Sequence, residues 1–312
     1  MSLKLCLKSL LAFILGISLV VGLCLATGVS WRILVDIAAH IRWPIFFVML
    51  ICSSSFIYLG ALKWQLITHN RKEPRPHFYL YYTAHAVLLG QFLPQSVATA
   101  LCRTAVMRLQ QNTSFKHSLL NAVYDLGFDF LIAVILIPAS LFQIVFGFSF
   151  VLWLMFAALL LLVAGFILVR LPNILSWPIM TKLKYPWLQR LKDERRQGLL
   201  APQLITKIML LSLARYGLVI TQLVLGVSAL NIAIPAKIIA YATPLATLPS
   251  LIPLTPANLG IAEWSWAYLL TLWHMPAAAG ASFALGFRLL ILAVQITVSV
   301  ILSAIYYLPN KK

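Results

Sequence analysis

Five charged side chains lie within long apolar stretches of this sequence, where an unpaired charge is unfavourable. They are Arg103, Asp125, Asp129, Arg215 and Glu263. An ionisable group at membrane depth needs a partner or a wet cavity, so such residues mark candidate functional positions. Asp125 and Asp129 are four residues apart and therefore fall on one face of a helix. We expect all five to line one cavity, in which the arginines attract a phosphate and the carboxylates bind a cationic group or a coupling proton.

Two other interpretations of these charges stay open. The charges can form structural pairs, for example Arg215 with Asp125, with no ligand between them. The Asp125-x-x-x-Asp129 spacing can also hold Mg²⁺, as in transferases that act on lipids within a membrane. Such enzymes carry a further acidic and glycine element upstream, and none precedes Asp125. No Walker, HExxH, GxSxG or CxxC motif occurs either, so we expect no metal and no cofactor.

Two proline breaks interrupt apolar sequence and add further candidates. Residues 253–263 read PLTPANLGIAE, and residues 93–96 read LPQS. Proline removes a backbone donor, and Asn and Gly tolerate conformations that a helix does not use. Broken backbone at membrane depth is tolerated where protein or a water-filled cavity surrounds it. The alternative is a surface loop that ends a helix. The breaks contribute these candidate substrate-binding or coupling positions: Pro94, Ser96, Thr255, Pro256, Asn258 and Gly260, beside Glu263.

The composition bounds the class of protein that must position these residues. Of the 312 residues, 62% are hydrophobic and 10% are charged, against about 25% charged in soluble domains. This balance predicts an all-α polytopic membrane protein that forms a single domain over residues 1–312. The net charge of +17 lies mostly between apolar segments. It therefore indicates membrane orientation and anionic-lipid contacts rather than nucleic-acid binding.

Apolar segments divide the chain into eight hydrophobic units. Six are long enough to be full spans, namely residues 9–26, 44–62, 118–142, 150–169, 208–230 and 281–307. Residues 77–111 and 237–273 are pairs of shorter limbs broken at Pro94 and Pro253, and they predict two re-entrant hairpins or pairs of short spans. The connections include a loop over residues 27–43 and a basic loop over residues 63–77 that starts at Lys63.

The basic loops predict the orientation of the chain. Residues 63–77 and 170–207 are rich in Lys and Arg, which places them, and both termini, in the cytoplasm. Residues 1–147 and 148–312 then repeat the order span, span, hairpin, span with opposite orientation. Transporters commonly have such an inverted-topology repeat, with the binding site between broken helices near the midplane.

Three sequence blocks carry a resemblance to a known family. The blocks are QFLPQSVATALCRTAVM (91–107), SLLNAVYDLGFDFLIA (118–133) and SLIPLTPANLGIAEWSW (250–266). With the pattern of spans, they resemble the transmembrane region of lysylphosphatidylglycerol synthases. This flippase-like domain is also found in the bacterial multiple peptide resistance factor.

The blocks match the family unequally. Pro256, Gly260 and Glu263 of the third block fit the family's P-G-G-x-G-x-x-E pattern. In the first block only Leu93, Pro94 and Arg103 fit, because residues 98–100 read Ala-Thr-Ala where the family has Gly-Gly-Asp. In the second block, Leu126 stands where the family often has Arg. The departures leave room for a different substrate or ion coupling.

The resemblance implies lipid translocation rather than lipid aminoacylation, since we find no soluble aminoacyl-transferring domain. We expect a non-enzymatic flippase for a phospholipid or lipid-linked glycan headgroup in the bacterial cytoplasmic (inner) membrane. Candidate partners are anionic phospholipid, aminoacylated lipid, polyprenyl-phosphate-linked glycan, and enzymes of glycolipid or lipid synthesis. The alternatives are the Asp125/Asp129 transferase and a non-transporting accessory subunit of glycolipid synthesis.

Overall fold

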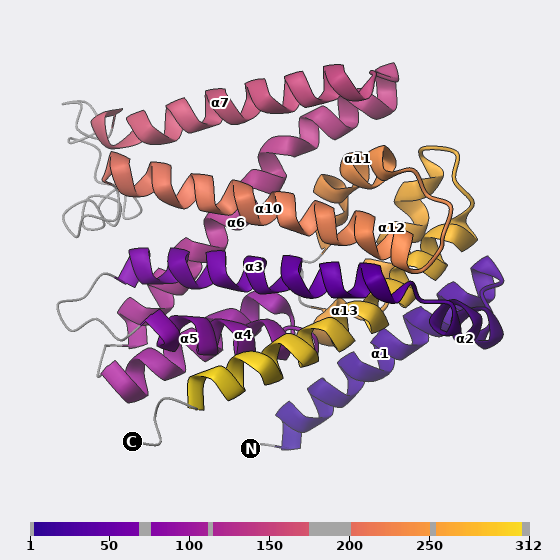
Figure 1. Cartoon of the computed structure of the whole chain (residues 1–312), viewed down its shortest axis with the longest axis horizontal. Coiled ribbons are helices and arrows are strands. Elements are labelled where there is room, and N and C mark those ends of the chain that lie inside the picture. Colours follow the sequence, from indigo (N-terminus) through magenta and orange to yellow (C-terminus); the bar gives the residue numbers. More distant parts are fainter. Residues whose placement is uncertain (1–2, 69–75, 112–114, 175–200, 250–253, 308–312) are drawn as a thin grey trace.

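The computed structural model describes residues 3–68, 76–111, 115–174, 201–249 and 254–307, and within them it contains helices and no strand (Figure 1). The expected all-helical class is confirmed. The helices before residue 147 are α1 (Leu3–Thr27), α2 (Trp31–Ala39), α3 (Trp43–Thr68), α4 (Pro76–Leu89), α5 (Gln95–Gln111) and α6 (Phe115–Phe146). The later ones are α7 (Phe150–Ile174), α10 (Pro202–Ala229), α11 (Ala236–Ala246), η2 (Pro256–Asn258), α12 (Ile261–Thr271) and α13 (Ala277–Tyr307).

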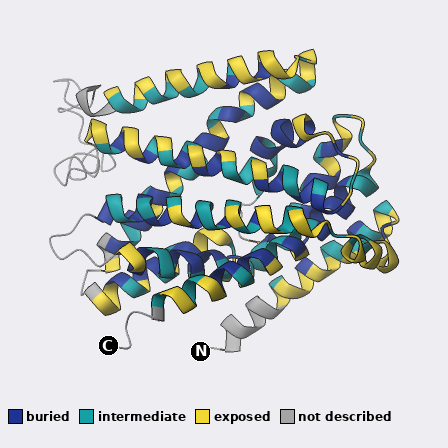
Figure 2. Ribbon diagram, in the orientation of Figure 1, coloured by how far each residue is buried: buried dark blue, intermediate teal, exposed yellow. Residues whose placement is uncertain are grey.

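The chain is a multi-pass membrane protein. Five of its described helices, α3, α6, α7, α10 and α13, are long and apolar enough to cross a bilayer. A sixth span results if α1 and α2 are counted together across the 91° bend between them. Large apolar side chains also cover the outer face of α7, where Leu162 is 72% exposed and Phe166 65% (Figure 2). A soluble protein rarely exposes so much apolar surface, whereas a membrane protein directs it toward the lipid tails.

The bend after α1 corrects the expectation of a loop over residues 27–43. Residues Trp31–Ala39 form α2, which has no buried residue and carries exposed Trp31, Ile33 and Val35 beside Arg32 and Asp36. A short helix of mixed apolar and charged residues is suited to lie in the membrane interface. Its nine residues are too few to cross a bilayer, so the sequence pattern predicts a connecting loop for this segment.

The expected end of the second span at Leu62 is also wrong. Helix α3 continues to Thr68, and Lys63, Trp64 and Ile67 are all buried within it. The helix occupies a central place, since it packs against α4, α6, α10 and α13. Lys63 therefore lies inside the protein and does not begin a basic loop.

Two pairs of short helices lie in opposite halves of the molecule, α4 with α5 toward the left of Figure 1 and α11 with α12 toward the right. Helix α4 ends at Leu89, earlier than expected, and a turn over residues 90–94 leads into α5. In the second pair, η2 lies between α11 and α12, and the expected break at Pro253 lies outside the described residues. Most of the expected basic loop 170–207 lies outside them too, while its two ends belong to α7 and α10.

Candidate functional site

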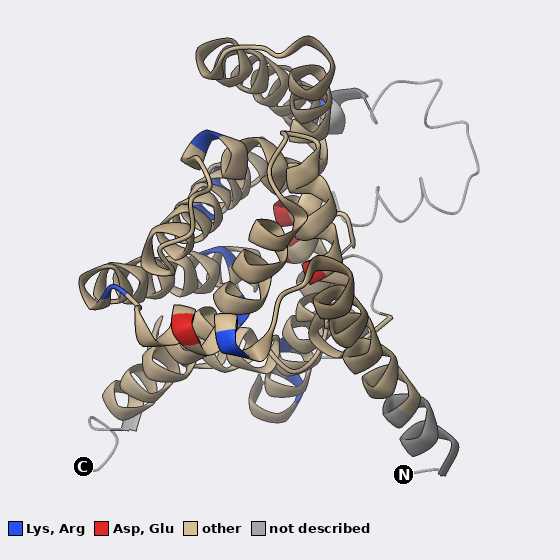
Figure 3. Cartoon of the chain, turned by 90° about the vertical axis from the view of Figure 1, so that its right-hand side faces the viewer, with Lys and Arg blue, Asp and Glu red and all other residues tan. Residues whose placement is uncertain are grey.

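Charged residues are few and scattered along the chain (Figure 3), but five of them meet at one place in the interior. Lys63 comes from α3, Arg103 from α5, Asp125 and Asp129 from α6, and Arg215 from α10. We call these five residues the ionic cluster. Because four helices supply them, the cluster exists only when the bundle is assembled.

Lys63 is the centre of the ionic cluster. Its Nζ lies 2.9 Å from Oδ1 of Asp125 and 2.5 Å from Oδ1 of Asp129. The same ammonium donates hydrogen bonds to the Asp125 carbonyl at 2.8 Å and to Oγ of Ser212 at 2.9 Å. The side chain is fully buried. Lys63 thus joins two successive turns of α6 to α10, and it shows that the four-residue spacing of the aspartates does place both carboxylates on one face.

Each arginine of the cluster pairs with one aspartate and stacks on one aromatic ring. Nη1 of Arg103 donates to Oδ2 of Asp125, and Nη1 of Arg215 donates to Oδ2 of Asp129. The Arg103 guanidinium lies 4.9 Å from the centre of the Trp64 ring. Aromatic faces attract such cations, most strongly where water is excluded. The pairing that the sequence suggested, Arg215 with Asp125, is therefore replaced by Arg215 with Asp129.

Gly60 makes room for the Arg215 guanidinium against α3. A Cβ atom at this position would lie 3.4 Å from Cζ of Arg215 and 3.3 Å from Cγ2 of Thr83. The same guanidinium lies 4.2 Å from the centre of the Phe56 ring. Phe56 and Gly60 are four residues apart and share one face of α3, so the arginine packs against that face.

The charges of the ionic cluster do not balance. Three cations face two carboxylates, so in their usual ionised forms they carry a formal charge of 3 − 2 = +1. Buried charge is tolerated where it is paired and hydrogen-bonded, and an uncompensated buried charge is strongly unfavourable. A site with this imbalance is therefore suited to receive an anion.

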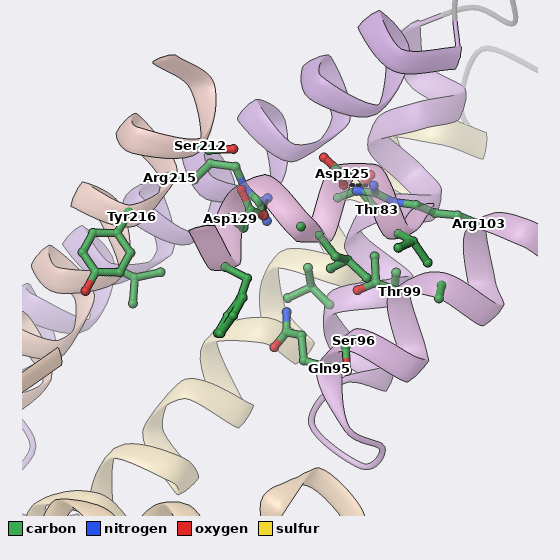
Figure 4. A pocket seen from close by; sticks show the side chains of 18 of the residues that line it. Thr83, Gln95, Ser96, Thr99, Arg103, Asp125, Asp129, Ser212, Arg215 and Tyr216 are labelled. Carbon is green, nitrogen blue, oxygen red and sulfur yellow. Dashed lines mark hydrogen bonds and ion pairs between the residues drawn. The ribbon is translucent and has the colours of Figure 1, made fainter. Parts of the chain in front are cut away.

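A cavity of about 600 Å³ opens beside the ionic cluster (Figure 4). Its inner wall is made of buried residues, namely Thr83, Ala86, Val87, Thr99, Arg103, Asp125, Ala133, Ser212, Arg215 and Tyr216. Its rim is made of exposed residues from α5 and α6, namely Gln95, Ser96, Val97, Val123 and Gly127. Thr247, which follows α11, also lines it. The cavity is therefore lined by residues of α3, α4, α5, α6 and α10 and by the residue that follows α11.

Several donors in the cavity wall have no hydrogen-bond partner within the described part of the chain. They are Nε of Arg103, Nε of Arg215, Oγ1 of Thr83 and Oη of Tyr216. A buried polar group without a partner costs about 1–3 kcal/mol. A ligand with several acceptor oxygens would remove that penalty.

A second charged group, Glu263 with Arg288, is separate from the cavity. Oε1 of Glu263 accepts a hydrogen bond from Nε of Arg288, and Oε2 accepts one from the backbone N–H of Gly260 at 2.7 Å. Nη1 and Nη2 of Arg288 each donate to the Ala257 carbonyl at 3.2 Å. We call these residues the η2 turn lock, because they fix the turn between η2 and α12.

The η2 turn lock holds backbone that favours few residue types. Ala257 has φ = 52°, Asn258 has φ = 54° and Gly260 has φ = 83°. A Cβ at Gly260 would lie 2.3 Å from Cβ of Leu19 on α1. Only glycine allows this close approach of α1 to the turn.

The structure does not bring all the expected site residues together. Arg103, Asp125, Asp129, Arg215 and Ser96 line the cavity, whereas Glu263 does not. The expectation of one cavity for all five charges is therefore wrong. Counting residues along a helix gives depth but not direction, and the Glu263 carboxylate turns back onto the first turn of its own helix. Four other candidates lie in or beside the η2 turn and not in the cavity wall: Thr255, Pro256, Asn258 and Gly260. Pro94 lies in the turn before α5.

A family model, described as the lysylphosphatidylglycerol synthase TM region, matches residues 10–299 of the chain. The chain belongs to this family. No match was found among curated proteins or among solved structures. Membership in the lysylphosphatidylglycerol synthase TM-region family indicates a role related to membrane lipids. The match spans both the ionic cluster and the η2 turn lock, so both are parts of the family domain.

Sequence reasoning missed three residues of this TM-region domain: Lys63 of the ionic cluster, its hydrogen-bond partner Ser212, and Arg288 of the η2 turn lock. Lys63 was assigned to a loop because the apolar run stops there. Ser212 gave no signal beyond a polar residue in an apolar helix. Arg288 is visible as a charge within the last span, but no spacing rule connects it with Glu263, which is 25 residues away. For Lys63 a signal did exist, since Gly60, Lys63 and Ile67 recur at three- and four-residue intervals and share one buried face of α3.

Proposed function

We propose that this protein translocates lipid headgroups across the membrane and that the headgroup passes through the cavity beside the ionic cluster. The lipid tails remain in the bilayer during this movement. The protein acts as a transporter and not as an enzyme, and its partners are membrane lipids. The proposal extends the lipid-related role of the family to one specific activity.

One observation carries the proposal: a cavity with charged residues in its inner wall has exposed valines, beside Gln95 and Ser96, at its rim. Arg103 and Arg215 lie in the wall, and exposed Val97 and Val123 lie at the rim. A lipid has the same division between a polar headgroup and apolar tails. A site for a soluble metabolite has no need of exposed valines on two helices of a membrane protein.

The arrangement of the helices supports an alternating transport cycle. The α4–α5 pair and the α11–α12 pair lie in opposite halves of the molecule, and Thr247, which follows α11, lines the cavity. We propose that the two pairs are re-entrant hairpins of an inverted-topology repeat, with six full spans around them. The basic composition of residues 69–77 and 175–200 favours cytoplasmic termini. We propose a bacterial inner membrane as the location.

Fluorescent-lipid flipping in proteoliposomes tests the proposal. Wild-type protein should move a labelled lipid between leaflets, and Arg215→Gln should lower the rate by about tenfold, the effect of losing one charge-assisted contact. Lys237→Met is the control, because Lys237 is an exposed cation at the start of α11 that does not line the cavity. Absence of flipping for anionic, zwitterionic and aminoacylated phospholipids and for polyprenyl-phosphate lipids, with folded protein, would contradict the proposal.

A lipid transferase that uses Asp125 and Asp129 is the second candidate. Both carboxylates are engaged by Lys63 and by one arginine each, which favours a role as charge partners over a role as Mg²⁺ ligands. The residues that the structure describes also contain no group of three or more His, Cys, Asp or Glu side chains placed to hold a metal ion. Mg²⁺-dependent turnover of a lipid by the purified protein would favour the transferase.

An accessory subunit of glycolipid synthesis is the third candidate. It predicts that neutral replacements in the ionic cluster preserve function in cells, provided that the protein folds. Loss of function in Arg215→Gln at normal protein abundance would exclude it.

A further inference from the structure

We infer that the lipid bound in the cavity has a headgroup with a net negative charge. Its phosphate oxyanion contacts Arg103 and Arg215, and the headgroup has no cationic group that would neutralise the phosphate. The inference rests on the proposed function and specifies its substrate class. It follows from three features of the ionic cluster: its net charge, its unused donors and the exposure of one of its pairs.

The net charge distinguishes three classes of headgroup. The ionic cluster has a formal charge of +1. A monoanionic headgroup brings the buried total to zero, a zwitterionic one leaves it at +1, and an aminoacylated one with a net positive charge raises it. Because uncompensated charge is most unfavourable in a buried site, the anionic class is favoured.

The unused donors supply specific contacts for a phosphate. Nε of Arg103, Nε of Arg215 and Oγ1 of Thr83 are buried, and they lack partners among the described residues. Arg103 is 2% exposed, Arg215 7% and Thr83 2%. All three residues line the cavity. Hydrogen bonds from guanidinium groups to a phosphate are charge-assisted and roughly twice as strong as neutral ones.

The two ion pairs of the cluster differ in their access to the cavity. The side chain of Asp129 is 27% exposed, whereas that of Asp125 is 1% exposed. The Arg215–Asp129 pair is therefore the accessible one, and a phosphate reaches Arg215 first. Asp125 is less exposed and pairs with Arg103, and the buried Lys63 contacts both carboxylates.

The remaining lining indicates a lipid phosphate rather than free phosphate. Val97 and Val123 are exposed at the rim, and Phe56, Leu126 and Phe130 complete an apolar wall. Free phosphate gains nothing from these residues. A phospholipid buries acyl surface against them at about 25 cal/mol per Å².

Equilibrium binding to detergent-purified protein tests the inference without requiring transport. The ligands are short-chain phosphatidylglycerol (anionic), phosphatidylcholine (zwitterionic), lysylphosphatidylglycerol (net cationic) and inorganic phosphate. Phosphatidylglycerol should bind at least about tenfold more tightly than each of the others. Equal or tighter binding of phosphatidylcholine or lysylphosphatidylglycerol would overturn the anionic class. Equal binding of inorganic phosphate would overturn the assignment to a lipid.

A charge series shows whether the imbalance causes the preference. Lys63→Met changes the cluster charge to 2 − 2 = 0, Asp129→Asn changes it to 3 − 1 = +2, and the double variant returns it to 2 − 1 = +1. The preference for phosphatidylglycerol over phosphatidylcholine should fall about tenfold in Lys63→Met, rise in Asp129→Asn and recover in the double variant. Lys237→Met removes the same type of charge outside the cavity and should leave the preference unchanged.

The outcomes separate this inference from the proposed function. If no lipid is flipped but phosphatidylglycerol binds preferentially and follows the charge series, the proposed function fails and the anionic site stands. If flipping occurs but the preference for phosphatidylglycerol over phosphatidylcholine does not change across the charge series, the inference is wrong and the proposed transport function is still supported. If Lys63→Met does not fold, Asp129→Asn decides alone, because an unchanged or lower preference in that variant contradicts the charge argument.

Discussion

The two pairs of short helices use buried charge in different ways. Beside α4 and α5, the ionic cluster joins side chains from four helices, has one cation in excess and retains unpaired donors next to a cavity. Beside α12, Glu263 and Arg288 bind each other and the backbone of the η2 turn. The first arrangement leaves hydrogen-bond donors that a ligand can use. In the second, Glu263 and Arg288 use their hydrogen-bonding groups on each other and on the backbone. A charge inside a membrane domain thus indicates a ligand site only when its partners leave it unsatisfied.

This difference separates two effects of substitution. In the ionic cluster, replacement should alter both stability and lipid binding, because the same groups hold the helices and face the cavity. In the η2 turn lock, replacement should alter stability while the lipid preference stays constant. The following changes test that division, from the largest expected effect to the smallest.

Asp125→Ala should give the largest loss of stability. The substitution leaves Lys63 and Arg103 buried with one carboxylate, Asp129, for three cations. Breaking a buried ion pair by removing one partner costs about 3–5 kcal/mol. Unfolding in mixed detergent micelles measures the change. Asp129→Ala is the matched comparison and should cost less, because its side chain is 27% exposed instead of 1%. Equal losses would show that access to the cavity does not weaken the contribution of a pair.

Gly260→Ala should destabilise the η2 turn without changing lipid preference. Alanine at φ = 83° is strained, and its Cβ would lie 2.3 Å from Cβ of Leu19. Strain of this kind costs about 1–3 kcal/mol. Gly22→Ala in α1 is the control, because its Cβ would meet no atom of the described part of the chain within 4 Å; we expect it to be neutral or stabilising by about 0.5–1 kcal/mol. A change in the ratio of phosphatidylglycerol to phosphatidylcholine affinity in Gly260→Ala would show that the two regions are coupled.

Glu263→Gln should have a smaller effect, confined to stability. The amide retains an acceptor for Gly260 but leaves Arg288 without its counter-charge. Arg288 is 24% exposed, so water compensates in part, and we expect a loss of about 1–2 kcal/mol. Arg288→Gln and the double variant complete a thermodynamic cycle, in which the two losses should not add. Additive losses would indicate that the two side chains act independently. A loss of flipping at unchanged stability would assign Glu263 to transport.

The sequence predicts the parts of this structure that depend on composition and helical periodicity. The apolar runs gave the helical membrane class, and the spacing of Asp125 and Asp129 placed both on one face, where Lys63 contacts them. The hydropathy pattern gave a wrong prediction at Lys63. It ends a span at the first charged residue, whereas a buried helix can continue beyond such a residue, as α3 does to Thr68. Spacing failed at Glu263, because a carboxylate near a helix start can bind its own backbone instead of a distant cavity. Both failures concern partners that only tertiary packing supplies.

Thr83→Val gives the smallest effect on stability and the sharpest test of the division. The Thr83 hydroxyl is buried, has no partner among the residues that the structure describes, and belongs to a residue that lines the cavity. Valine has the same shape, so unfolding should be unchanged or up to about 1 kcal/mol less favourable. If that hydroxyl donates to a phosphate oxyanion, affinity for phosphatidylglycerol should fall by about tenfold, the effect of losing one hydrogen bond to a charged group.

Thr104→Val is the matched control for this substitution. Its hydroxyl is also buried and without a partner among the described residues, but Thr104 does not line the cavity. Both variants should therefore unfold like the wild type, and only Thr83→Val should bind phosphatidylglycerol less tightly. If Thr83→Val and Thr104→Val bind phosphatidylglycerol equally well, the unpaired donors of the cavity wall do not contact the lipid. The contrast between the ionic cluster and the η2 turn lock would then rest on the excess charge alone.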